Sequence, residues 1–519
     1  MTRSPLLALL YPFIIAACAA PKFTDAFSAL SPPPTNGGIP HLEEYPDVEG
    51  NQVQKNGVTK GGRPLPYASP TTGITSSTTY TNTATTVARP AIILNTNARS
   101  VSEDLVPIAE SIFGKEYVYV TTSEEEAKQA AASMMQQNIS MVIPVGGDGT
   151  LSSLINFLCS HIRETFPFLT VEEAMKELPL VAYLPLGTGN GVGSVVGSEL
   201  MFNNQPTWKI FGQKRRKLRN VENILKSFHE IAQQMNENPD YLNTDLAPDV
   251  VEIPMMEVSY PDSKLHDDTL CFFAGAGFDS LMLQDFQSVK KWAIRTKILT
   301  KTLSSVAGYC VALVVKTLPK CVTRQEHNIQ VRLTTRDPET LWVDHRRGDV
   351  VQQVGPTSSS GSNNKDGETL LYQGMTGILA AGTSPFYGGG LRLFPFARMT
   401  KDKMHLRLGR IHPLRGFFNI PQIFEGSFRD KRSSSFGCMD YIGGDFDVFI
   451  STTATTSDSE DESDNKNTKG FPVQHSGESV GYFERFRLRV VKQPVRFVTL
   501  MRKRVVNEAA DASYGAPSS

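Results

Sequence analysis

The stretch that decides the fold, residues 139–150, reads Ile-Ser-Met-Val-Ile-Pro-Val followed by Gly146-Gly147-Asp148-Gly149-Thr150. The apolar run is typical of a buried strand. A helix is predicted after it, because apolar residues repeat at helical spacing at Leu151, Leu154, Ile155 and Leu158. Glycines between a strand and a helix let backbone N–H groups approach phosphate oxygens, and the helix N-terminus adds a partial positive charge. The stretch therefore predicts a phosphate-holding loop.

Asp148 is the informative residue of this loop. A carboxylate beside a polyphosphate is repulsive unless it binds a metal ion, orients one through water, or accepts the proton of an attacking hydroxyl. The competing interpretation is an ordinary Gly-Asp-Gly turn in which Thr150 is the N-cap of the helix.

A second glycine loop follows an apolar strand predicted at residues 180–184 and reads Pro185-Leu186-Gly187-Thr188-Gly189-Asn190-Gly191. Thr188 and Asn190 can donate hydrogen bonds to phosphate or ribose oxygens, while Gly187 and Gly189 keep the backbone close to a ligand. The loop lacks G-x-G-x-x-G spacing, so a dinucleotide site of the Rossmann type is not supported. Two such loops at successive strand ends predict one shared nucleotide site.

Strands and helices alternate around both loops. Strands are predicted at 90–95 and 117–121, and a helix at 124–137 that a capping box of Ser123 and Glu126 opens. This alternation predicts a parallel, doubly wound sheet. Beyond about residue 250 the pattern changes to short apolar runs broken by glycine, interrupted by one helical stretch at about 286–318.

The predicted fold is thus a doubly wound α/β nucleotide-binding domain followed by an antiparallel β-sandwich domain. Segments rich in Pro, Gly, Ser and Thr are expected to be linkers or surface inserts. The predicted divisions are a leader at 1–30, a linker at 31–88, the α/β domain at 89–250, the β domain at 251–505 with inserts at 355–367 and 451–470, and a tail at 506–519.

Composition narrows the possible partners. A net charge of −1 gives no whole-protein field that would hold DNA or RNA, so nucleic acid is not an expected partner. The six cysteines include no C-x-x-C pair, so they indicate neither a zinc site nor a disulfide framework. The basic run at 214–219 is typical of a solvated face, or of a patch that holds anionic lipid headgroups.

The first thirty residues resemble a signal sequence, because Arg3 precedes an apolar stretch and small residues follow. A cleaved leader and an uncleaved anchor are both compatible with this pattern. Residues 15–18 resemble a bacterial lipoprotein box, and residues 24–29, with Phe27, resemble the junction of bipartite plastid leaders. We expect a membrane-associated protein in an organelle, plastid or secretory, or alternatively at the cytoplasmic face of a membrane.

The ordered motifs together resemble the diacylglycerol kinase catalytic family, which pairs G-G-D-G-T with a downstream P-x-G-T-x-N-D. Asn95 matches the asparagine that ends the family's first strand, and Thr121-Thr122 match the threonine after its second strand. Three later segments also match in order, and the resemblance covers about 90–500. They are Gly275-Ala276-Gly277-Phe278-Asp279, Phe386-Tyr387-Gly388-Gly389-Gly390 with Pro395, Ala397 and Asp402, and Pro472-Val473-Gln474-His475-Ser476-Gly477-Glu478.

The resemblance implies a lipid kinase with its active site in the cleft between two domains, ATP and Mg²⁺ as cofactors, and diacylglycerol or a sphingoid base as acceptor. Asp148 and Glu478 would be the catalytic and metal-orienting residues, with Glu478 taking the proton of the acceptor hydroxyl. The competing interpretation of Glu478 is a surface glutamate in a turn. The implied nucleotide-binding residues are Asn95, Thr122, Gly146, Gly147, Asp148, Gly149, Thr150, Gly187, Thr188, Gly189 and Asn190.

Three positions depart from the family pattern. Gly191 and Ser476 replace aspartates, and Lys403 replaces a glycine. A serine cannot stand in for a carboxylate at neutral pH. A non-catalytic nucleotide- or lipid-binding relative is therefore an alternative to an active enzyme. A kinase of a soluble acceptor, similar to NAD kinases, is a second alternative, because those enzymes also carry a G-G-D-G loop.

Overall fold

The structure is a computed structural model, and the part of the chain it describes begins at Arg89 and ends at Leu500. The predicted leader, linker and tail lie outside the described residues, as do most of the two predicted inserts. The described ranges are 89–98, 101–187, 190–197, 213–244, 247–263, 266–296, 306–323, 327–345, 348–356, 367–387, 391–419, 422–423, 425–428, 437–451 and 470–500.

The first sheet is mostly parallel and carries both glycine loops at its strand ends. Its order is β2-β1-β3-β4-β21-β6, with β5 paired to β3, and only β6 runs antiparallel to its neighbour. Its strands are β1 (Pro90–Asn95), β2 (Val118–Thr121), β3 (Met141–Gly146), β4 (Leu180–Val181), β5 (Leu184–Pro185), β6 (Val250–Ile253) and β21 (Val495–Val498).

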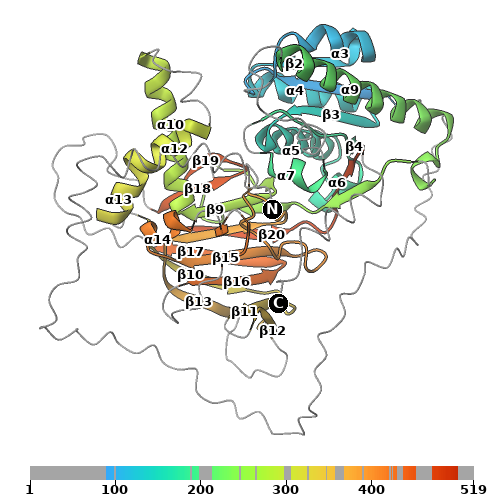
Figure 1. Ribbon diagram of the computed structural model, residues 1–519. Coiled ribbons are helices and arrows are strands. Elements are labelled where there is room, and N and C mark those ends of the chain that lie inside the picture. The colour runs from blue at the N-terminus through green and yellow to red at the C-terminus, as the bar shows by residue number, and fades with distance from the viewer. Residues whose placement is uncertain are drawn as a thin grey trace, which may run out of the picture. The chain divides into compact units, whose positions relative to one another are not determined.

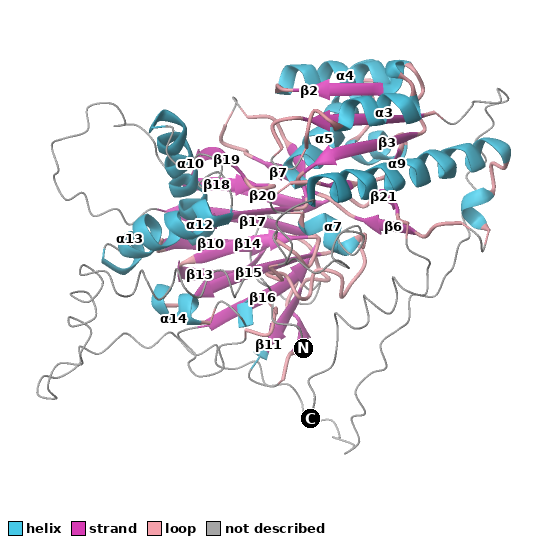
Figure 2. Ribbon diagram, turned by 45° about the horizontal axis from the view of Figure 1, so that its top comes forward, coloured by secondary structure: helices cyan, strands magenta, loops and turns pink. Residues whose placement is uncertain are grey.

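Helices cover both faces of this sheet, as Figures 1 and 2 show. Apolar residues of strand β1 pack against helices on both sides, because successive side chains of a strand point to opposite faces of its sheet. Ile92 and Leu94 pack in one buried cluster with α3 (Leu105–Phe113) and α9 (Gln213–Glu237). Ala91 and Ile93 pack in another with α4 (Glu124–Gln136) and α5 (Asp148–Thr165). The predicted alternation of strands and helices is confirmed.

The last described strand returns to this first sheet. Phe497 of β21 pairs with Val181 of β4 and with Val251 of β6, and its side chain is fully buried. Residue 250, where the sequence predicted a domain boundary, is the first residue of β6. Strand β6 precedes the segment that forms the antiparallel sheets, and strand β21 follows it. Both strands complete the α/β sheet.

Two antiparallel sheets make up the rest. One has the order β13-β10-β17-β20-β7-β8 and the other β12-β11-β16-β15-β14-β9-β18-β19. Side chains alternate between core and surface along β20, and buried residues of both sheets join one cluster. The strands are β7 (Met256–Ser259), β8 (Thr269–Cys271), β9 (Phe273–Gly277), β10 (Ile329–Thr335), β11 (Leu341–Asp344), β12 (Val350–Gln353), β13 (Thr369–Thr376), β14 (Ile378–Gly382), β15 (Met404–Arg410), β16 (Gly437–Gly443), β17 (Asp445–Ser451), β18 (Phe471–His475), β19 (Glu478–Phe483) and β20 (Arg485–Val490).

The helical stretch predicted at 286–318 is several pieces. They are α10 (Phe278–Thr296), α12 (Val306–Ala312), a π-helical turn η3 (Leu313–Thr317) and α13 (Leu318–Thr323). The short α6 (Val171–Lys176), α7 (Gly191–Val195) and α14 (Pro413–Phe418) and the 3₁₀ turns η1 (Lys115–Tyr117) and η2 (Tyr241–Asn243) complete the described helices. Within this part of the chain no helix is long and apolar enough to cross a bilayer.

The predicted capping box of α4 is only half right. Ser123 accepts the N–H of Glu126 at 3.2 Å, as an N-cap does. The Glu126 carboxylate, however, accepts the N–H and the hydroxyl of Thr122, at 2.6 and 2.8 Å. The side chain reaches one residue further back than the box requires, because Thr122 offers it two donors.

Candidate active site

The two glycine loops meet through their backbones. The carbonyl of Gly146 accepts the N–H groups of Leu186 and Gly187, at 2.8 and 2.9 Å. A Cβ on Gly187 would lie 2.2 Å from the Cα of Gly147, a distance that no side chain tolerates. The structure thus brings together the loops that the sequence predicted to share one site, and it does so with glycines on both sides of the contact.

The end of β1 is tied to the first turn of α5. The side-chain amide of Asn95 donates to the hydroxyl of Thr150 at 2.9 Å. A Cβ on Gly146 would lie 2.5 Å from the same hydroxyl, so the turn needs a glycine there. The N-cap of α5 is Gly147 rather than Thr150, so the Thr150 hydroxyl is not capping the helix.

The Asp148 carboxylate is buried and accepts three hydrogen bonds. They come from the N–H groups of Gly191 and Val192, at 2.6 and 3.3 Å, and from the hydroxyl of Tyr183 at 3.3 Å. Gly191 and Val192 form the first turn of α7, so Asp148 caps that helix from a distant part of the chain. Burial raises the pKa of Asp148 to about 6, although these donors act in the opposite direction.

Asn190 holds the second loop closed with its own side chain. Its Oδ1 accepts the N–H of Gly187 at 3.1 Å, and its Nδ2 donates to the carbonyls of Pro185 and Gly187, at 3.3 and 3.0 Å. The backbone of Asn190 is left-handed, with φ 51°. Thr188 and Gly189, also predicted to bind nucleotide, lie outside the described residues.

Glu478 reaches this site from the other end of the chain. It follows the two-residue turn between β18 and β19, in which Ser476 and Gly477 have φ values of 51° and 82°. Two successive positive φ angles are the signature of a type I′ hairpin turn. A Cβ on Gly149 would lie 3.1 Å from Oε1 of Glu478, so the carboxylate stands directly over the first turn of α5.

Glu478 is an exposed residue, although one oxygen of its carboxylate lies against the first turn of α5. The protein atoms around it and the like charge of Glu124 raise the pKa of Glu478 above its ordinary value. A raised pKa makes a carboxylate a stronger base, so the electrostatics of this corner suit proton removal.

The hairpin is fastened to α5 by a contact between two serines. The hydroxyls of Ser152 and Ser476 are 2.9 Å apart, and both residues are buried. Asn156, one turn later on α5, bonds both backbone groups of Leu270 at 2.8 Å. Ser476, which departs from the family pattern, therefore joins the α/β part to the antiparallel sheets.

A buried polar network supports the same hairpin. Asp279 accepts the hydroxyl of Tyr387 at 2.9 Å and the side-chain amide of Gln474 at 3.2 Å. Gln474 also donates to Tyr387 at 2.7 Å and accepts the N–H of Gly477 at 3.2 Å. Burial raises the pKa of Asp279 to about 6. Three segments that the sequence analysis matched to the family pattern thus converge behind the turn that carries Glu478.

Sequence reasoning assigned no role to several residues of this site. Tyr183, which bonds Asp148, lies in an apolar run that reads only as a strand, so no local signal marks it. Ser152 and Glu124 are ordinary helix residues by pattern, and only the fold brings Ser152 to Ser476 and Glu124 near Glu478. Lys403, the third departure, is paired with Asp337 and Glu339 at 2.8 and 3.0 Å.

The predicted metal ligands do not form a ready site for Mg²⁺. Asp148 uses its carboxylate on three protein donors, which leaves little capacity for a cation. Among the described residues there is no group of three His, Cys, Asp or Glu side chains placed to hold a metal ion. Asp148 does not fit a direct Mg²⁺ ligand in this arrangement, and its orientation of a metal ion through water, like metal binding by Glu478, stays a prediction.

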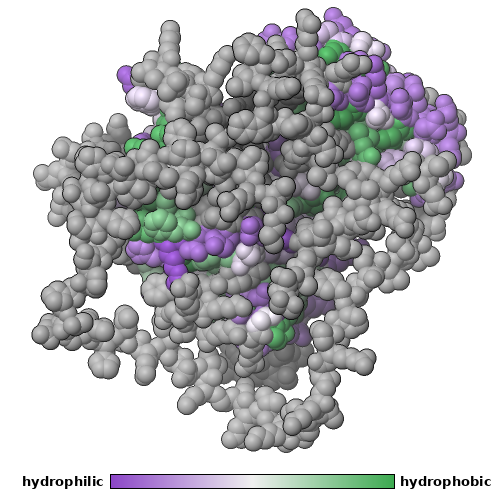
Figure 3. Space-filling model, in the orientation of Figure 1, coloured by the Kyte–Doolittle hydropathy of each residue, from purple (hydrophilic) through white to green (hydrophobic). Residues whose placement is uncertain are grey.

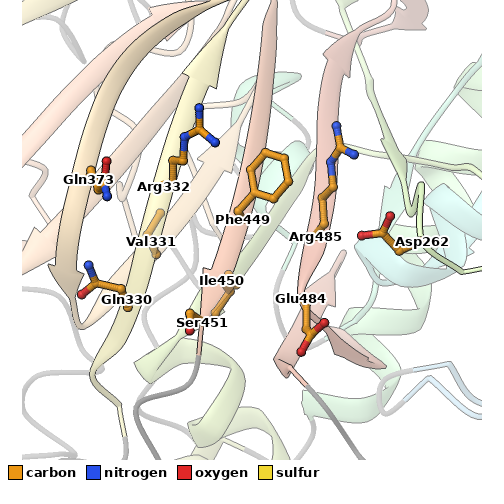
Figure 4. Close-up of a pocket in the computed structure, with 10 residues that line it drawn as sticks. All are labelled: Asp262, Gln330, Val331, Arg332, Gln373, Phe449, Ile450, Ser451, Glu484 and Arg485. Carbon is orange, nitrogen blue, oxygen red and sulfur yellow. The ribbon is translucent and has the colours of Figure 1, made fainter.

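An open groove of about 560 Å³ lies elsewhere, on the outer face of the sheet that contains β10, β17 and β20. Figure 4 shows Phe449 between Arg332 and Arg485, whose guanidinium carbons lie 5.8 and 4.5 Å from its ring centre. Arg485 is also paired with Asp447. None of the predicted site residues lines this groove.

Comparison with known proteins agrees with the motif pattern. Residues 90–239 match the family model described as the diacylglycerol kinase catalytic domain. No curated protein matches the chain. One crystal structure is of a protein from Bacillus anthracis str. Sterne that is named a provisional diacylglycerol kinase. The match covers 79% of this chain and 96% of that chain, with 12% sequence identity and a TM-score of 0.43.

A second Bacillus anthracis structure, named a diacylglycerol kinase, is also 12% identical over 79% of this chain and 96% of its own, with a TM-score of 0.38. Yeast NADH kinase complexed with NADH is 9% identical over 83% of this chain and 90% of its own, with a TM-score of 0.34. The match at residues 90–239 shows that the chain carries the catalytic domain of the diacylglycerol kinase family, a family of nucleotide-using kinases.

Proposed function

We propose that this chain is a lipid kinase that transfers the γ-phosphate of ATP to the hydroxyl of a lipid such as diacylglycerol or a sphingoid base. The observation that carries the proposal is the position of Glu478 over the first turn of α5. A carboxylate with a raised pKa thereby stands beside a loop whose glycines leave backbone N–H groups open to phosphate.

The residues divide the reaction between them. N–H groups at the start of α5 hold the phosphates, and the helix N-terminus stabilises their negative charge. Glu478 accepts the proton of the lipid hydroxyl while the oxygen of that hydroxyl forms a bond to the γ-phosphorus. The bond from that phosphorus to the β–γ bridging oxygen breaks, and ADP leaves. Positioning and charge stabilisation supply most of the rate in such transfers.

Asp148 has a positioning role in this proposal. Its carboxylate fixes the start of α7, and thereby the backbone of the second loop, relative to the first. The family's usual aspartate at position 191 is a glycine here, whose N–H donates to Asp148 at 2.6 Å. Mg²⁺, where it accompanies ATP, would supply charge neutralisation on the phosphates.

The lipid acceptor is supported by the second half of the chain. Asp279, Tyr387 and Gln474 come from three segments that resemble the lipid kinase signature, and they support the hairpin of Glu478. We also propose a membrane-associated location, reached through the signal-like first thirty residues. Those residues lie outside the part of the chain that the structure describes.

A second candidate function is binding without transfer. It is favoured by the hydrogen bonds that occupy Asp148 and by the missing carboxylates at Gly191 and Ser476. Incubation of the chain with γ-labelled ATP, Mg²⁺ and a panel of diacylglycerol, sphingosine and NAD separates the candidates. We expect label in the lipid phase. Label in NAD alone would identify a soluble acceptor, and ATP binding without label anywhere would identify a binding protein.

A further inference from the structure

Helix α10 leads away from the candidate site toward an unusual surface. It follows β9 directly, and its Gln284 donates to the Tyr482 hydroxyl of β19 at 3.2 Å, four residues beyond Glu478. The first half of α10 is thus tied to the hairpin of the candidate base. Its second half carries the features that follow.

Large apolar side chains are exposed at the end of α10 and in the turn η3. Trp292 and Ile294 are each 53% exposed, and Val315 is 66% exposed. Val289 and Ala293 of the same helix are buried, and Trp292 and Ile294 lie on either side of that buried face. Figure 3 shows a separate apolar patch bordered by hydrophilic side chains at the left of the molecule, below the end of α10 and at the height where Figure 1 places α13 and α14.

A hydrogen bond joins the two exposed segments into one surface. Lys316 donates to the hydroxyl of Ser288 at 2.7 Å. Ser288 lies four residues before Trp292, hence on the same face of α10. The turn η3, which contains Val315, therefore lies beside the side of α10 that Trp292 occupies. We call Lys290, Lys291, Trp292, Ile294, Arg295 and Val315 the α10 surface.

The charged residues of the segment around the α10 surface are all basic. Residues 286–325 contain no Asp or Glu in a chain whose net charge is −1, and they contain basic residues at Lys290, Lys291, Arg295, Lys297, Lys301, Lys316, Lys320 and Arg324. Lys320 is paired with Asp285. Lys290, Lys291 and Arg295 form no ion pair with any described residue. Basic side chains near an anionic bilayer each contribute about 1 kcal/mol of attraction.

We infer that the α10 surface docks the protein on an anionic membrane. Nucleic acid or an acidic protein would satisfy the charges alone, whereas exposed tryptophan and isoleucine among lysines match the headgroup region of a bilayer. The purpose of this docking rests on the proposed function, because a lipid kinase finds its acceptor in a membrane. Docking through α10 would hold the hairpin of Glu478 near the surface where an acceptor lipid resides.

Vesicle binding of the full chain tests this inference without any acceptor lipid. The chain has three tryptophans, so Trp208→Phe with Trp342→Phe leaves Trp292 as the sole reporter. We expect its emission to shift to shorter wavelength with phosphatidylserine vesicles and to stay unchanged with phosphatidylcholine vesicles. No shift with either vesicle, or an equal shift with both, would overturn the inference.

Charge and apolar variants give the second arm. K290Q/K291Q/R295Q should weaken co-sedimentation with phosphatidylserine vesicles about 100-fold, whereas K115Q/K128Q, at exposed lysines of the α/β part, should not. Ile294→Ser should weaken binding, and Phe168→Ser, at an exposed apolar residue of the α/β part, should not. Equal binding by all four would contradict the inference.

The same variants separate this inference from the proposed function. Phosphorylation of a short-chain diacylglycerol, presented as dissolved monomers, should be unchanged in K290Q/K291Q/R295Q, because that acceptor needs no membrane. Phosphorylation without vesicle binding in the native chain would refute the docking surface alone. Vesicle binding without phosphorylation would refute the lipid kinase alone.

Discussion

Gly187 lies so close to Gly147 that a Cβ on Gly187 would sit 2.2 Å from the Cα of Gly147. Gly187 also donates its N–H to the carbonyl of Gly146 at 2.9 Å. The two loops therefore form one backbone surface at the carboxyl ends of β3 and β5. In open α/β sheets, ligands bind outside the carboxyl ends of the strands, where such a surface can face phosphate groups.

Gly187→Ala should separate the two loops. Either the backbone of Gly147 moves or the variant folds less stably, by about 1–3 kcal/mol. We expect at least a tenfold loss of affinity for ATP, measured by calorimetric titration. Gly416→Ala in α14 is the control, since a Cβ there would meet only Ile411, at 3.9 Å. Its ATP affinity should match that of the native chain. Unchanged affinity in Gly187→Ala would show that the loops do not share a nucleotide site.

Gly477→Ala tests whether the hairpin turn positions Glu478. Gly477 and Gly348 both have a φ of 82°, and a Cβ on either would meet nothing within 4 Å. Each alanine variant should therefore lose about 1–2 kcal/mol of stability from backbone strain alone. Only Gly477→Ala should also lower kcat, because it alone disturbs the turn beside the candidate base. An equal kcat in the two variants would contradict this role of the turn.

The local part of the site was predictable from sequence. An apolar run, two glycines and a helical repeat occur within twenty residues of each other, so β3, the loop and the start of α5 need no distant information. The contact of the two loops also follows, because neighbouring parallel strands end at the same edge of a sheet.

Long-range pairing was not predictable in the same way. The short run at β21 is compatible with any sheet, and it joins β4 and β6 because Phe497 fills the core there. Likewise, the hydrogen bonds that Asp148 accepts depend on where α7 and Tyr183 pack. Sequence patterns identify residue types for chemistry, but burial and partners decide which of them stay available to a ligand.

The pH dependence of transfer should report the ionisation of Glu478. A base must be deprotonated, so kcat should fall as pH falls through the raised pKa of Glu478. Glu124→Gln removes the nearby like charge, so this acid limb should move to lower pH. Glu125→Gln, at the next exposed glutamate of α4, should leave the limb in place. A limb that does not move in Glu124→Gln would contradict the proposed electrostatic coupling.

Asp279 should contribute a decrease in the free energy of unfolding between about pH 4 and pH 6. Asp279 has its pKa raised to about 6 by burial, so its contribution to stability is fully present below its unfolded pKa and is lost as pH rises through the folded value. In the native chain this decrease should be on the order of 2–3 kcal/mol in the free energy of unfolding, and it should be absent in Asp279→Asn. Urea unfolding at several pH values measures it. An unchanged pH dependence in the variant would show that Asp279 is ionised without cost.

The central claim is that Glu478 takes the proton of a lipid hydroxyl. Its most direct test is kcat for lipid phosphorylation at saturating ATP in Glu478→Gln, with Glu484→Gln as the matched exposed glutamate. We predict a loss of about 10²–10⁴-fold in Glu478→Gln, with ATP affinity and unfolding midpoint unchanged, and native kcat in Glu484→Gln. Native kcat in Glu478→Gln would contradict the assignment of Glu478 as the base.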